Sequence, residues 1–211
     1  MAREYAETIL VCVLVFVFLR GFVFQQSEIP SGSMEDTVLP GDYILVNRFL
    51  YAPTAFGWER QLLPSRSIER GDLVVFKHPR EPERDFIKRV IGLPGETVEL
   101  RQGHVWVDGS RIDEPYINPL YREPESRPPI RVPDGQYFVL GDHRNNSLDS
   151  RAWGAVPREL IKGRAFMVLL STHAPRPRGE AAGKVTVRST LRKFWDLALH
   201  SRWDRALRLI R

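Results

Sequence analysis

The sequence predicts a mainly β fold, an antiparallel, barrel-like domain that follows one N-terminal transmembrane helix. Two observations lead to this prediction. Short runs of β-branched and aromatic residues recur after position 40, with Gly, Pro or Asp in the turns between them. A separate apolar run occupies most of the first 24 residues. We therefore divide the 211 residues into an N-terminal stub with the anchor, 1–26, a β domain, 27–175, and a basic C-terminal segment, 176–211.

The N-terminal apolar run, Ile9–Phe24, reads ILVCVLVFVFLRGFVF. At 1.5 Å per residue its roughly 16 residues span about 24 Å, slightly less than a hydrocarbon core of about 30 Å, and Ala6 and Thr8 extend it. Arg20 lies near the far end, where a long side chain reaches the interface. The alternative is a cleaved signal peptide, but no Ala-x-Ala site follows the run. We therefore expect a retained anchor.

The expected strands of the β domain are short, apolar and bounded by turn residues. They are residues 43–46, 72–76, 86–91, 97–100, 104–107, 137–140 and 165–170. The sequence Arg101-Gln102-Gly103 between two of them predicts a hairpin, and Asp108-Gly109 is a second turn candidate.

Two parts of the chain depart from this pattern. Residues 115–133 are rich in proline, and we expect them to form an excursion on the surface. Residues 190–211 carry apolar side chains among many bases, which fits an amphipathic helix in part. This tail either packs on the domain, as a helix or a strand, or lies on a membrane surface. We favour packing on the domain.

The composition narrows the classes of function. The one cysteine, Cys12, lies in the apolar run, so neither an intrachain disulfide nor a thiolate metal cluster is expected. The net charge of +5 does not indicate nucleic acid, because much of the excess lies after position 176. We expect no metal, no cofactor and no nucleic-acid partner. The histidines show no metal-ligand spacing: they are His78, His104, His143, His173 and His200.

The stretch IPSGSM, Ile29–Met34, comes soon after the apolar run. Small hydroxyl residues in a Gly-containing turn form either a linker or the position of a nucleophile. A serine hydroxyl needs a base, because its own pKa makes it a weak nucleophile. Among the histidines the best candidate is His143, which lies in the Asp-, Asn- and Arg-rich loop GDHRNNS.

A lysine also serves as a base when its pKa is lowered from about 10.4, and burial lowers the pKa of a lysine by several units. Lys88 lies in an apolar strand, where alternation turns it to the same face as Phe86 and Val90. The other interpretation is a solvated strand lysine. The segment GDHRNNSLDSRAWG, 141–154, likewise belongs to a site or is an Asx-rich turn with a local Asp149–Arg151 pair.

Taken together, IPSGSM, DFIKRVIGLPGE and GDHRNNSLDSRAWG, in this order after an anchor, resemble the type I bacterial signal peptidases. RGDLVVFKHP adds a fourth matching stretch, and the resemblance extends from Arg3 to about Leu170. These enzymes are membrane-bound serine proteases of the Ser-Lys kind. The resemblance implies an endopeptidase that cleaves signal peptides from exported pre-proteins through an acyl-enzyme. It also implies a single-pass protein of the cytoplasmic membrane, in contact with the bilayer, with the N-terminus inside and the catalytic domain on the outer face.

The resemblance assigns roles by position in this sequence. Ser33 matches the nucleophile and Lys88 the general base. Ser31 would add its hydroxyl to an oxyanion hole beside the Ser33 backbone N–H, and Ser147 would orient Lys88. Asp149 and Arg151, with Asp142 and Arg89, would brace the loop, and Gly141 would keep space beside the lysine. The residues implied to line the substrate pockets are Ile29, Pro30, Met34, Val38, Phe86 and Ile87.

The sequence departs from the family pattern at two places. After Met34 the family reads x-Pro-Thr-Leu, whereas this chain has Glu35-Asp36-Thr37-Val38. The family reads Gly-Asp-Asn-Arg-Asp where this chain has His143 and Asn145 in place of Asn and the second Asp. These departures put the bracing of the loop and the shape of the pocket in doubt, but not the reaction.

Two other classes of protein compete with this interpretation. A LexA-type repressor also uses a Ser-Lys pair on a β domain, but it needs an N-terminal helix-turn-helix, where this chain has an apolar segment. A catalytically silent, membrane-anchored binding module would have no reason to combine Ser33, Lys88 and Ser147. The sequence does not indicate which pre-proteins are cut or the oligomeric state.

Overall fold

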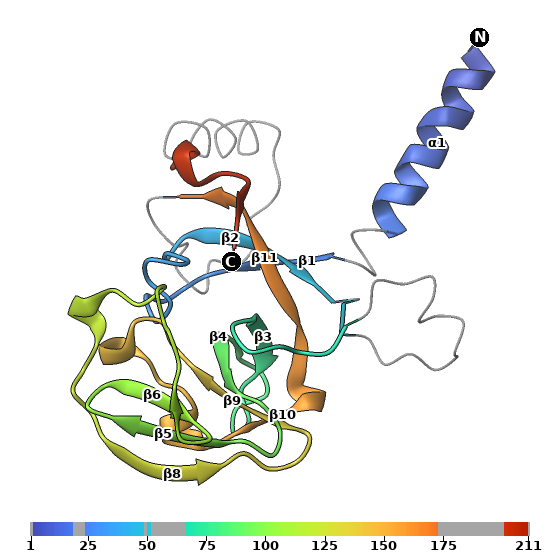
Figure 1. Ribbon diagram of the computed structural model, residues 1–211. Helices are drawn as coiled ribbons and strands as arrows, with labels where there is room; N and C mark the ends of the chain where they lie inside the picture. Colours follow the sequence, from blue (N-terminus) through green and yellow to red (C-terminus); the bar gives the residue numbers. More distant parts are fainter. Residues whose placement is uncertain (1, 19–23, 49, 52–65, 173–200, 211) are drawn as a thin grey trace.

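A computed structural model describes residues 2–18, 24–48, 50–51, 66–172 and 201–210, and these form one helix beside a mainly β body (Figure 1). The strands pair antiparallel in two sheets. The larger sheet has eight strands in the order β1-β2-β11-β3-β4-β9-β10, with β12 also paired to β11. Its strands are β1 (Phe24–Glu28), β2 (Asp42–Asn47), β3 (Leu73–Lys77), β4 (Asp85–Gly92), β9 (Gln136–Leu140), β10 (Val156–Pro157), β11 (Ile161–Ser171) and β12 (Arg208–Leu209).

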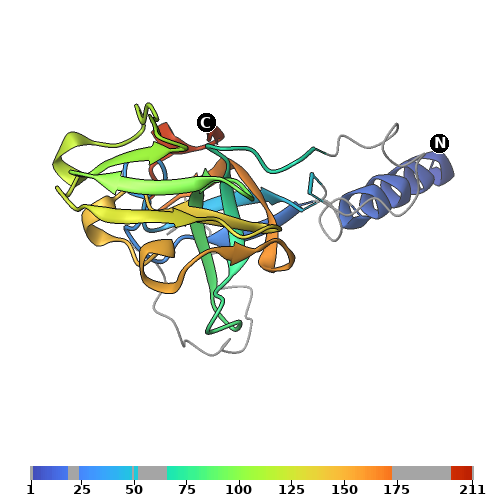
Figure 2. The same cartoon turned by 60° about the horizontal axis from the view of Figure 1, so that its bottom comes forward.

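The smaller sheet has four strands in the order β7-β6-β5-β8, and it forms a separate layer that comes forward in Figure 2. Its strands are β5 (Thr97–Arg101), β6 (His104–Val107), β7 (Ser110–Arg111) and β8 (Arg127–Arg131). The helices are α1 (Ala2–Phe18) and α3 (Ser150–Trp153), and the 3₁₀ turns are η2 (Pro119–Tyr121), η3 (Arg144–Asn146), η4 (Arg158–Leu160) and η5 (Trp203–Arg205).

The burial of the strands follows their sequence patterns. In β2 the fully buried Ile44 and Val46 alternate with half-buried neighbours, as expected for a strand with one face on the core. In β4 every residue from Ile87 to Gly92 is buried, because both faces of this central strand are covered. Buried side chains gather in three clusters. One lies below the loop between β1 and β2, one around β3, and one between the two sheets.

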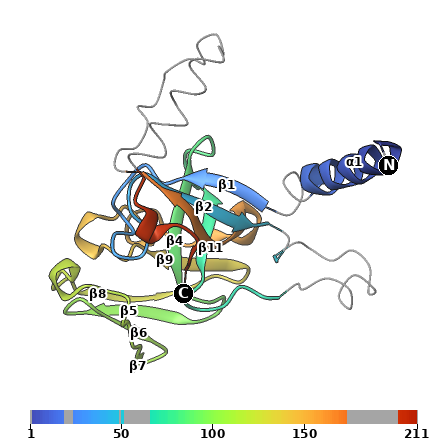
Figure 3. The ribbon, with the colours of Figure 1, turned by 90° about the horizontal axis from the view of Figure 1, so that it is seen from above.

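The mainly β prediction is confirmed. Each of the seven expected strands lies within an observed strand, except that β3 begins one residue late, at Leu73. The barrel is not closed. The larger sheet curls, as Figure 3 shows from above, but its two end strands, β1 and β10, do not pair with each other. The larger sheet is therefore an open half-barrel.

The N-terminal region differs from the expectation. Helix α1 ends at Phe18, and β1 begins at Phe24, inside the segment 1–26 that we assigned to the anchor. Phe24 pairs with Asn47 of β2, and its ring lies 5.6 Å from that of Phe166. These contacts bring the end of the apolar run into the sheet. Among the described residues, no helix has the length and apolar character needed to cross a membrane.

The Pro-rich excursion and the tail also contain strands that the sequence did not predict. Pro128 and Pro129 lie in β8, which is tolerated because β8 is an edge strand of the smaller sheet. In the tail, β12 pairs with β11, and Ile210 is buried against the core. The helix considered for 190–211 falls largely on residues 173–200, which lie outside the described residues.

Candidate active site

The loop that carries Ser33, residues Ile29–Gly41, leaves β1 and returns to β2; we call it the nucleophile loop. Its two ends are joined by backbone hydrogen bonds, from Ile29 N to Asp42 O and from Gly41 N to Ile29 O, both 2.9 Å. Inside the loop the N–H of Val38 donates to the carbonyl of Met34 at 2.8 Å, which forms one helical turn. Ser33 lies at the start of this turn.

Met34 and Val38, which we expected to line the substrate pocket, are not among the residues that line the cavity beside Ser33 and Lys88. Both side chains are fully buried and pack with Ile44, Val46 and their neighbours in the core below the loop. The reason is the helical turn, because residues four apart lie on the same face, and this face points inward. The two side chains anchor the loop to the core.

Lys88 lies in β4, opposite Val74 of β3, and its side chain is 1% exposed. Its Nζ donates to Ser33 Oγ at 2.6 Å and to the Ile87 carbonyl at 2.9 Å. Strand alternation puts Phe86 on the same side, with its ring centroid 5.6 Å from Nζ. A hydroxyl and an amine from two distant parts of the chain are therefore in direct contact.

Burial lowers the pKa of Lys88 from 10.5 to about 8, because the ammonium loses its hydration. The carboxylates of Asp149 and Asp142 oppose this shift, and Arg151 adds to it. At pH 7 a group with this pKa is neutral in about one tenth of the molecules, against roughly 0.03% for a free lysine. The site therefore supplies an amine that can accept a proton near neutral pH.

Gly141 is the first residue of the segment 141–154 and lies against Ser33. A Cβ at this position would lie 2.1 Å from Ser147 Oγ and 2.6 Å from the Ser33 carbonyl oxygen, so only glycine fits. The Gly141 N–H donates to Asp149 Oδ2 at 3.1 Å, and the His143 N–H donates to the Ser33 carbonyl at 3.2 Å. The segment 141–154 thus holds the backbone of the nucleophile loop directly.

Two buried ion pairs brace this arrangement. Arg151 donates from Nε to Asp149 Oδ1 at 2.8 Å, and the Asp149 side chain is fully buried. Arg89 donates to both oxygens of Asp142, at 2.9 and 2.7 Å, and both side chains are at most 2% exposed. Asp142 also accepts the hydroxyl of Thr37 at 2.6 Å, which ties this pair to the nucleophile loop.

Ser147 does not make the hydrogen bond to Lys88 that the resemblance implies. Its Oγ is buried and has no hydrogen-bond partner in the described part of the chain. The amine of Lys88 is oriented by Ser33 and by the Ile87 carbonyl instead. Ser147 packs closely against Gly141.

A pocket of about 370 Å³ opens beside the Ser33–Lys88 pair. Of the residues expected to line it, Ile29, Pro30, Phe86 and Ile87 do so. Ser31 also lines the pocket and is exposed, and the Ser33 backbone N–H has no hydrogen-bond acceptor among the described residues. The further lining residues are Ser27, Glu28, Gly32, Val75, Arg84, Asp85, Asn146 and Leu148.

The sequence reasoning missed two groups of supporting residues. His143, which departs from the family pattern, pairs with Glu35 at 2.9 Å between Nδ1 and Oε2. The signal that could have found this pair is the histidine at position 143, where the family has Asn. The Tyr121 ring stacks on His143, with the centroids 3.7 Å apart.

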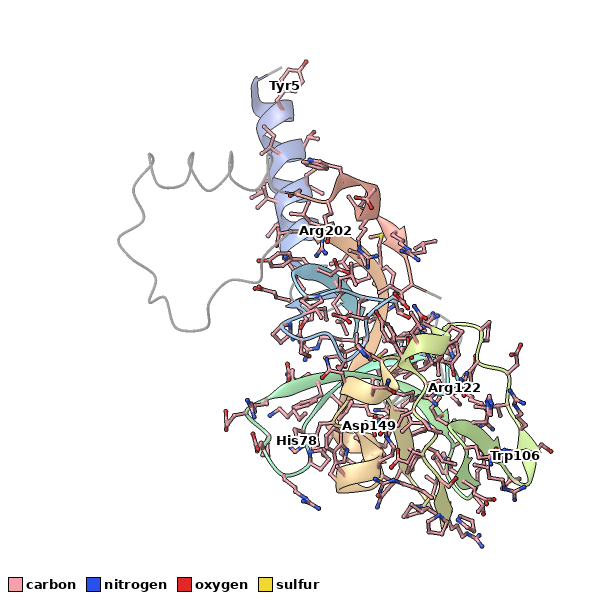
Figure 4. The ribbon with its side chains drawn as sticks, turned by 90° about the vertical axis from the view of Figure 1, so that its left-hand side faces the viewer. Tyr5, His78, Trp106, Arg122, Asp149 and Arg202 are labelled. Carbon is pink, nitrogen blue, oxygen red and sulfur yellow. The ribbon has the colours of Figure 1, made fainter. Side chains whose placement is uncertain are left out.

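The second missed group comes from the tail and holds the end of the nucleophile loop. Arg205 donates to Asp42 Oδ2 at 2.7 Å and to the Thr37 carbonyl at 3.2 Å. Arg202, labelled in Figure 4, donates to the carbonyls of Pro40 and Thr172, each at 2.7 Å. We call residues 201–210 the C-terminal clamp. No sequence pattern indicated it, because nothing in the sequence distinguishes Arg202 and Arg205 from the other arginines of the basic tail.

The fold and the site define a class of protein. A serine hydroxyl touches a buried lysine with a lowered pKa, at the edge of an open pocket on an antiparallel sheet, and this is the arrangement of a hydrolase that uses a Ser-Lys pair. Within the described residues no triad of serine, histidine and carboxylate is formed around Ser33.

The family comparison identifies the particular kind of hydrolase. The family described as "Signal peptidase, peptidase S26" matches residues 2–170, and the chain belongs to this family. A Synechocystis protein named "Probable signal peptidase I-2" is 41% identical over 172 residues, covering 78% of this chain and 71% of that protein. The signal peptidase I of Pseudomonas aeruginosa is 33% identical over 210 residues, covering 82% and 74%.

The solved structures that match include a signal peptidase I from Enterococcus faecalis, with 32% identity, covering 47% of this chain and 97% of that chain. Its TM-score is 0.42, which is too low to support a conclusion about the fold. The family match and the sequence relatives identify the chain as a serine endopeptidase of the signal peptidase family. The LexA-type and binding-module alternatives are therefore set aside.

Proposed function

We propose that the chain removes signal peptides from exported pre-proteins, with Ser33 as the nucleophile and Lys88 as the general base. The observation that supports this most directly is the 2.6 Å contact between Lys88 Nζ and Ser33 Oγ. The lysine is almost completely buried, and its pKa is lowered to about 8. The contact makes proton transfer possible, and the lowered pKa makes it possible near neutral pH.

In the first step neutral Lys88 accepts the hydroxyl proton while Ser33 Oγ forms a bond to the scissile carbonyl carbon. The hydrogen bond then runs from the serine to the amine, opposite to its direction in the resting state. The lysine next gives the proton to the leaving amine, and the C–N bond breaks to leave an acyl-enzyme. A water molecule, deprotonated by Lys88, releases the acyl group, and the proton returns to Ser33.

The oxyanion that forms in these steps needs donors that are already in place. The Ser33 N–H lacks an acceptor within the described residues, and the exposed Ser31 hydroxyl lies at the same pocket. We assign these two groups to the oxyanion hole. Asp149, Arg151, Asp142 and Arg89 hold the surrounding loop, and Gly141 provides the space.

A substrate strand can bind where β4 has an open edge. Residues Asp85–Lys88 pair with β3 on one side, whereas pairing with β9 begins only at Arg89. An extended peptide in the pocket would place alternate side chains against Ile29, Pro30, Phe86 and Ile87. Small residues, mainly Ala, are therefore expected at the first and third positions before the cut.

We further propose that the protein is anchored in the cytoplasmic membrane, with the N-terminus inside and the catalytic domain on the outer face. In support, five apolar side chains of α1 are each more than half exposed: Ile9, Leu10, Val11, Val13 and Leu14. Alkaline extraction of membranes tests the anchor. Labelling of single cysteines, introduced before and after α1 in a protein from which Cys12 has been removed, tests the orientation. Release into the soluble fraction would contradict the anchor.

The test of the proposed function is cleavage of a purified pre-protein in detergent. The wild type should release the signal peptide at one site, and Lys88→Ala should not. Lys77→Ala is the matched control, because Lys77 is an exposed strand lysine at the end of β3. A substrate with a large residue at the first or third position before the cut should be a poor one. Cleavage by Lys88→Ala at the wild-type rate would refute the proposal.

A further inference from the structure

An aromatic cluster lies behind the substrate pocket. It consists of Phe76, His78, Phe86 and Trp153, which come from β3, the turn after β3, β4 and α3. The His78 and Trp153 rings lie 4.6 Å apart and nearly perpendicular. Both contact Phe86, His78 at 4.8 Å and Trp153 at 5.5 Å between ring centroids. Figure 4 shows His78 and Asp149, the cap of α3, on the same side of the domain.

Phe86 is the member of this cluster that reaches the substrate. It lines the pocket, and its ring lies 5.6 Å from Lys88 Nζ. His78 and Trp153 do not line the pocket. The Phe86 ring is thus a wall with the substrate space on one side and two aromatic rings on the other.

Both supporting rings are held by rigid structure. His78 Nδ1 accepts the N–H groups of Glu81 at 3.0 Å and Arg80 at 3.3 Å, which fixes the ring in the β3–β4 turn. Trp153 ends α3, whose cap Asp149 is fully buried and paired with Arg151. Phe86 therefore packs against two rings whose positions are fixed.

The polar ring atoms of His78 and Trp153 indicate that the shape of these two rings matters. His78 Nε2 and Trp153 Nε1 are buried and have no hydrogen-bond partner in the described part of the chain. A buried N–H without an acceptor destabilises the fold. A phenylalanine at position 153 would avoid that cost, whereas one at position 78 would also lose the two hydrogen bonds that His78 Nδ1 accepts. The rings contribute to the wall despite this cost.

We propose that His78 and Trp153 are positioning residues that set, through Phe86, the largest substrate side chain the pocket admits. This inference rests on the proposed function and adds to it the structural origin of the preference for small residues. Shortening Trp153 opens a space into which the Phe86 ring can turn, and the pocket becomes deeper. A deeper pocket accepts one or two more methyl groups on the substrate.

The experiment compares kcat/KM for substrates that carry Ala, Val or Leu at the first or third position before the cut. For Trp153→Leu, the ratio of kcat/KM for the Val substrate to kcat/KM for the Ala substrate should rise by about tenfold at one of these positions. One methylene group in an apolar pocket changes kcat/KM by about this factor. Trp153→Phe should restore the wild-type ratio in large part. Phe86→Ala should raise it further.

Trp106→Leu is the matched control, because this tryptophan lies in the smaller sheet, away from His78 and Asp149 in Figure 4. Its ratio should equal that of the wild type. His78→Asn provides a second variant if Trp153→Leu does not fold, since the asparagine oxygen can still accept the turn N–H groups. It should raise the Val-to-Ala ratio in the same direction.

The outcomes separate this inference from the proposed function. If the wild type cleaves no pre-protein, the proposed function fails. If the wild type cleaves Ala substrates and the folded Trp153→Leu loses activity equally on Ala and Val substrates, the role is structural and the inference is overturned. The acid limb of kcat/KM is measured in parallel. A shift of that limb with an unchanged ratio would also overturn the inference, because the effect would then act on Lys88 alone.

Discussion

The two members of the proposed catalytic pair are held in different ways. Lys88 lies in β4, which pairs residue by residue with β3, its neighbour in the hairpin. Ser33 lies in the nucleophile loop, whose side-chain ties come from far along the chain. Thr37 bonds Asp142, 105 positions away, and Arg205 bonds the Thr37 carbonyl from 168 positions away. The position of the base is thus a local property of one hairpin, whereas the position of the nucleophile depends on the whole fold.

The largest expected effect is the loss of activity when either Ser33 or Lys88 is replaced, because the two side chains act as one unit. Ser33→Ala and Lys88→Ala should each lower kcat by about 10⁴-fold or more, and the double variant should be no worse than either. Lys88→Arg should be as inactive, because a guanidinium stays protonated. The measurement is cleavage of a pre-protein under single-turnover conditions.

His143→Ala serves as the control for this pair. The side chain contacts Glu35 and Tyr121, not Ser33 Oγ. The variant should keep most of its activity. If a folded His143→Ala is as inactive as Lys88→Ala, the base is a histidine and the assignment of Lys88 is wrong.

The second prediction concerns the backbone and hydroxyl donors of the nucleophile loop. Ser31→Ala should lower kcat by about 100- to 1000-fold, roughly 3–4 kcal/mol, with little change in KM. Ser31→Thr should retain more activity if its hydroxyl reaches the same point. Steady-state kinetics on a small-residue substrate gives both constants. Full activity in Ser31→Ala would remove Ser31 from the oxyanion hole.

The third prediction tests the long-range ties. Arg205→Met leaves the carboxylate of Asp42 buried without its closest charged partner, so the free energy of unfolding should fall by about 3 kcal/mol. Since the nucleophile loop loosens, kcat should also fall by about 10- to 100-fold. Arg208→Met, an exposed neighbour in β12, is the control. Urea unfolding and kcat are measured together. Lower stability with an unchanged kcat would mean that the C-terminal clamp does not position Ser33.

The acid limb of the kcat/KM pH profile of Arg205→Met tests whether the C-terminal clamp also affects Lys88. Lys88 is held by the β3–β4 hairpin, and the charges that act on its pKa, those of Asp149, Asp142 and Arg151, bond no residue of the clamp in the described structure. The limb should therefore stay where the wild type has it. A displaced limb would show that the base depends on the clamp as well.

The smallest expected effect is a gain in stability when Lys88 is replaced, opposite in sign to the loss expected for Arg205→Met. The folded pKa of Lys88, about 8, lies below its ordinary value of 10.5, which corresponds to a destabilisation of about 3 kcal/mol. Lys88→Met removes it but loses hydrogen bonds worth about 1 kcal/mol, so the variant should be about 2 kcal/mol more stable at pH 7.

The pH dependence of this difference gives the sharper test. Below pH 8 the lysine is charged in both the folded and unfolded states, and the full cost of burying that charge is present. Between pH 8 and 10.5 the unfolded chain holds more protons, so the wild type gains stability relative to the variant as the pH rises. Urea unfolding of both proteins at pH 7 and pH 10.5 measures this. A difference that does not change with pH would contradict a lowered pKa.

The same comparison explains which features the sequence could predict. The strands and the inward face of Lys88 follow from alternation over a few residues, and the structure contains them. The resemblance supplied Ser33, but alternation gives no information about a loop. The inward turn of Met34 and Val38 therefore could not be read, because a single helical turn has no long periodic pattern.

Other features depended on contacts between distant segments. The pairing of Asp42 with Arg205 and of Glu35 with His143 involves charged residues whose partners are ambiguous in a chain with many of them. β1 was not predicted because it begins at the end of an apolar run. β8 was not predicted because it contains two prolines, which only an edge strand tolerates. These elements are chosen by tertiary pairing and not by local propensity.

The C-terminal clamp has a consequence for the timing of synthesis. A growing chain folds from its N-terminal side, so the β3–β4 hairpin with Lys88 can form early. The nucleophile loop is not fully tied until residues 201–210 have been translated, because Arg202 and Arg205 hold its far end. We therefore expect a nascent chain that already contains Ser33 and Lys88 to be less active than the finished protein. Full activity is expected only after translation of the clamp.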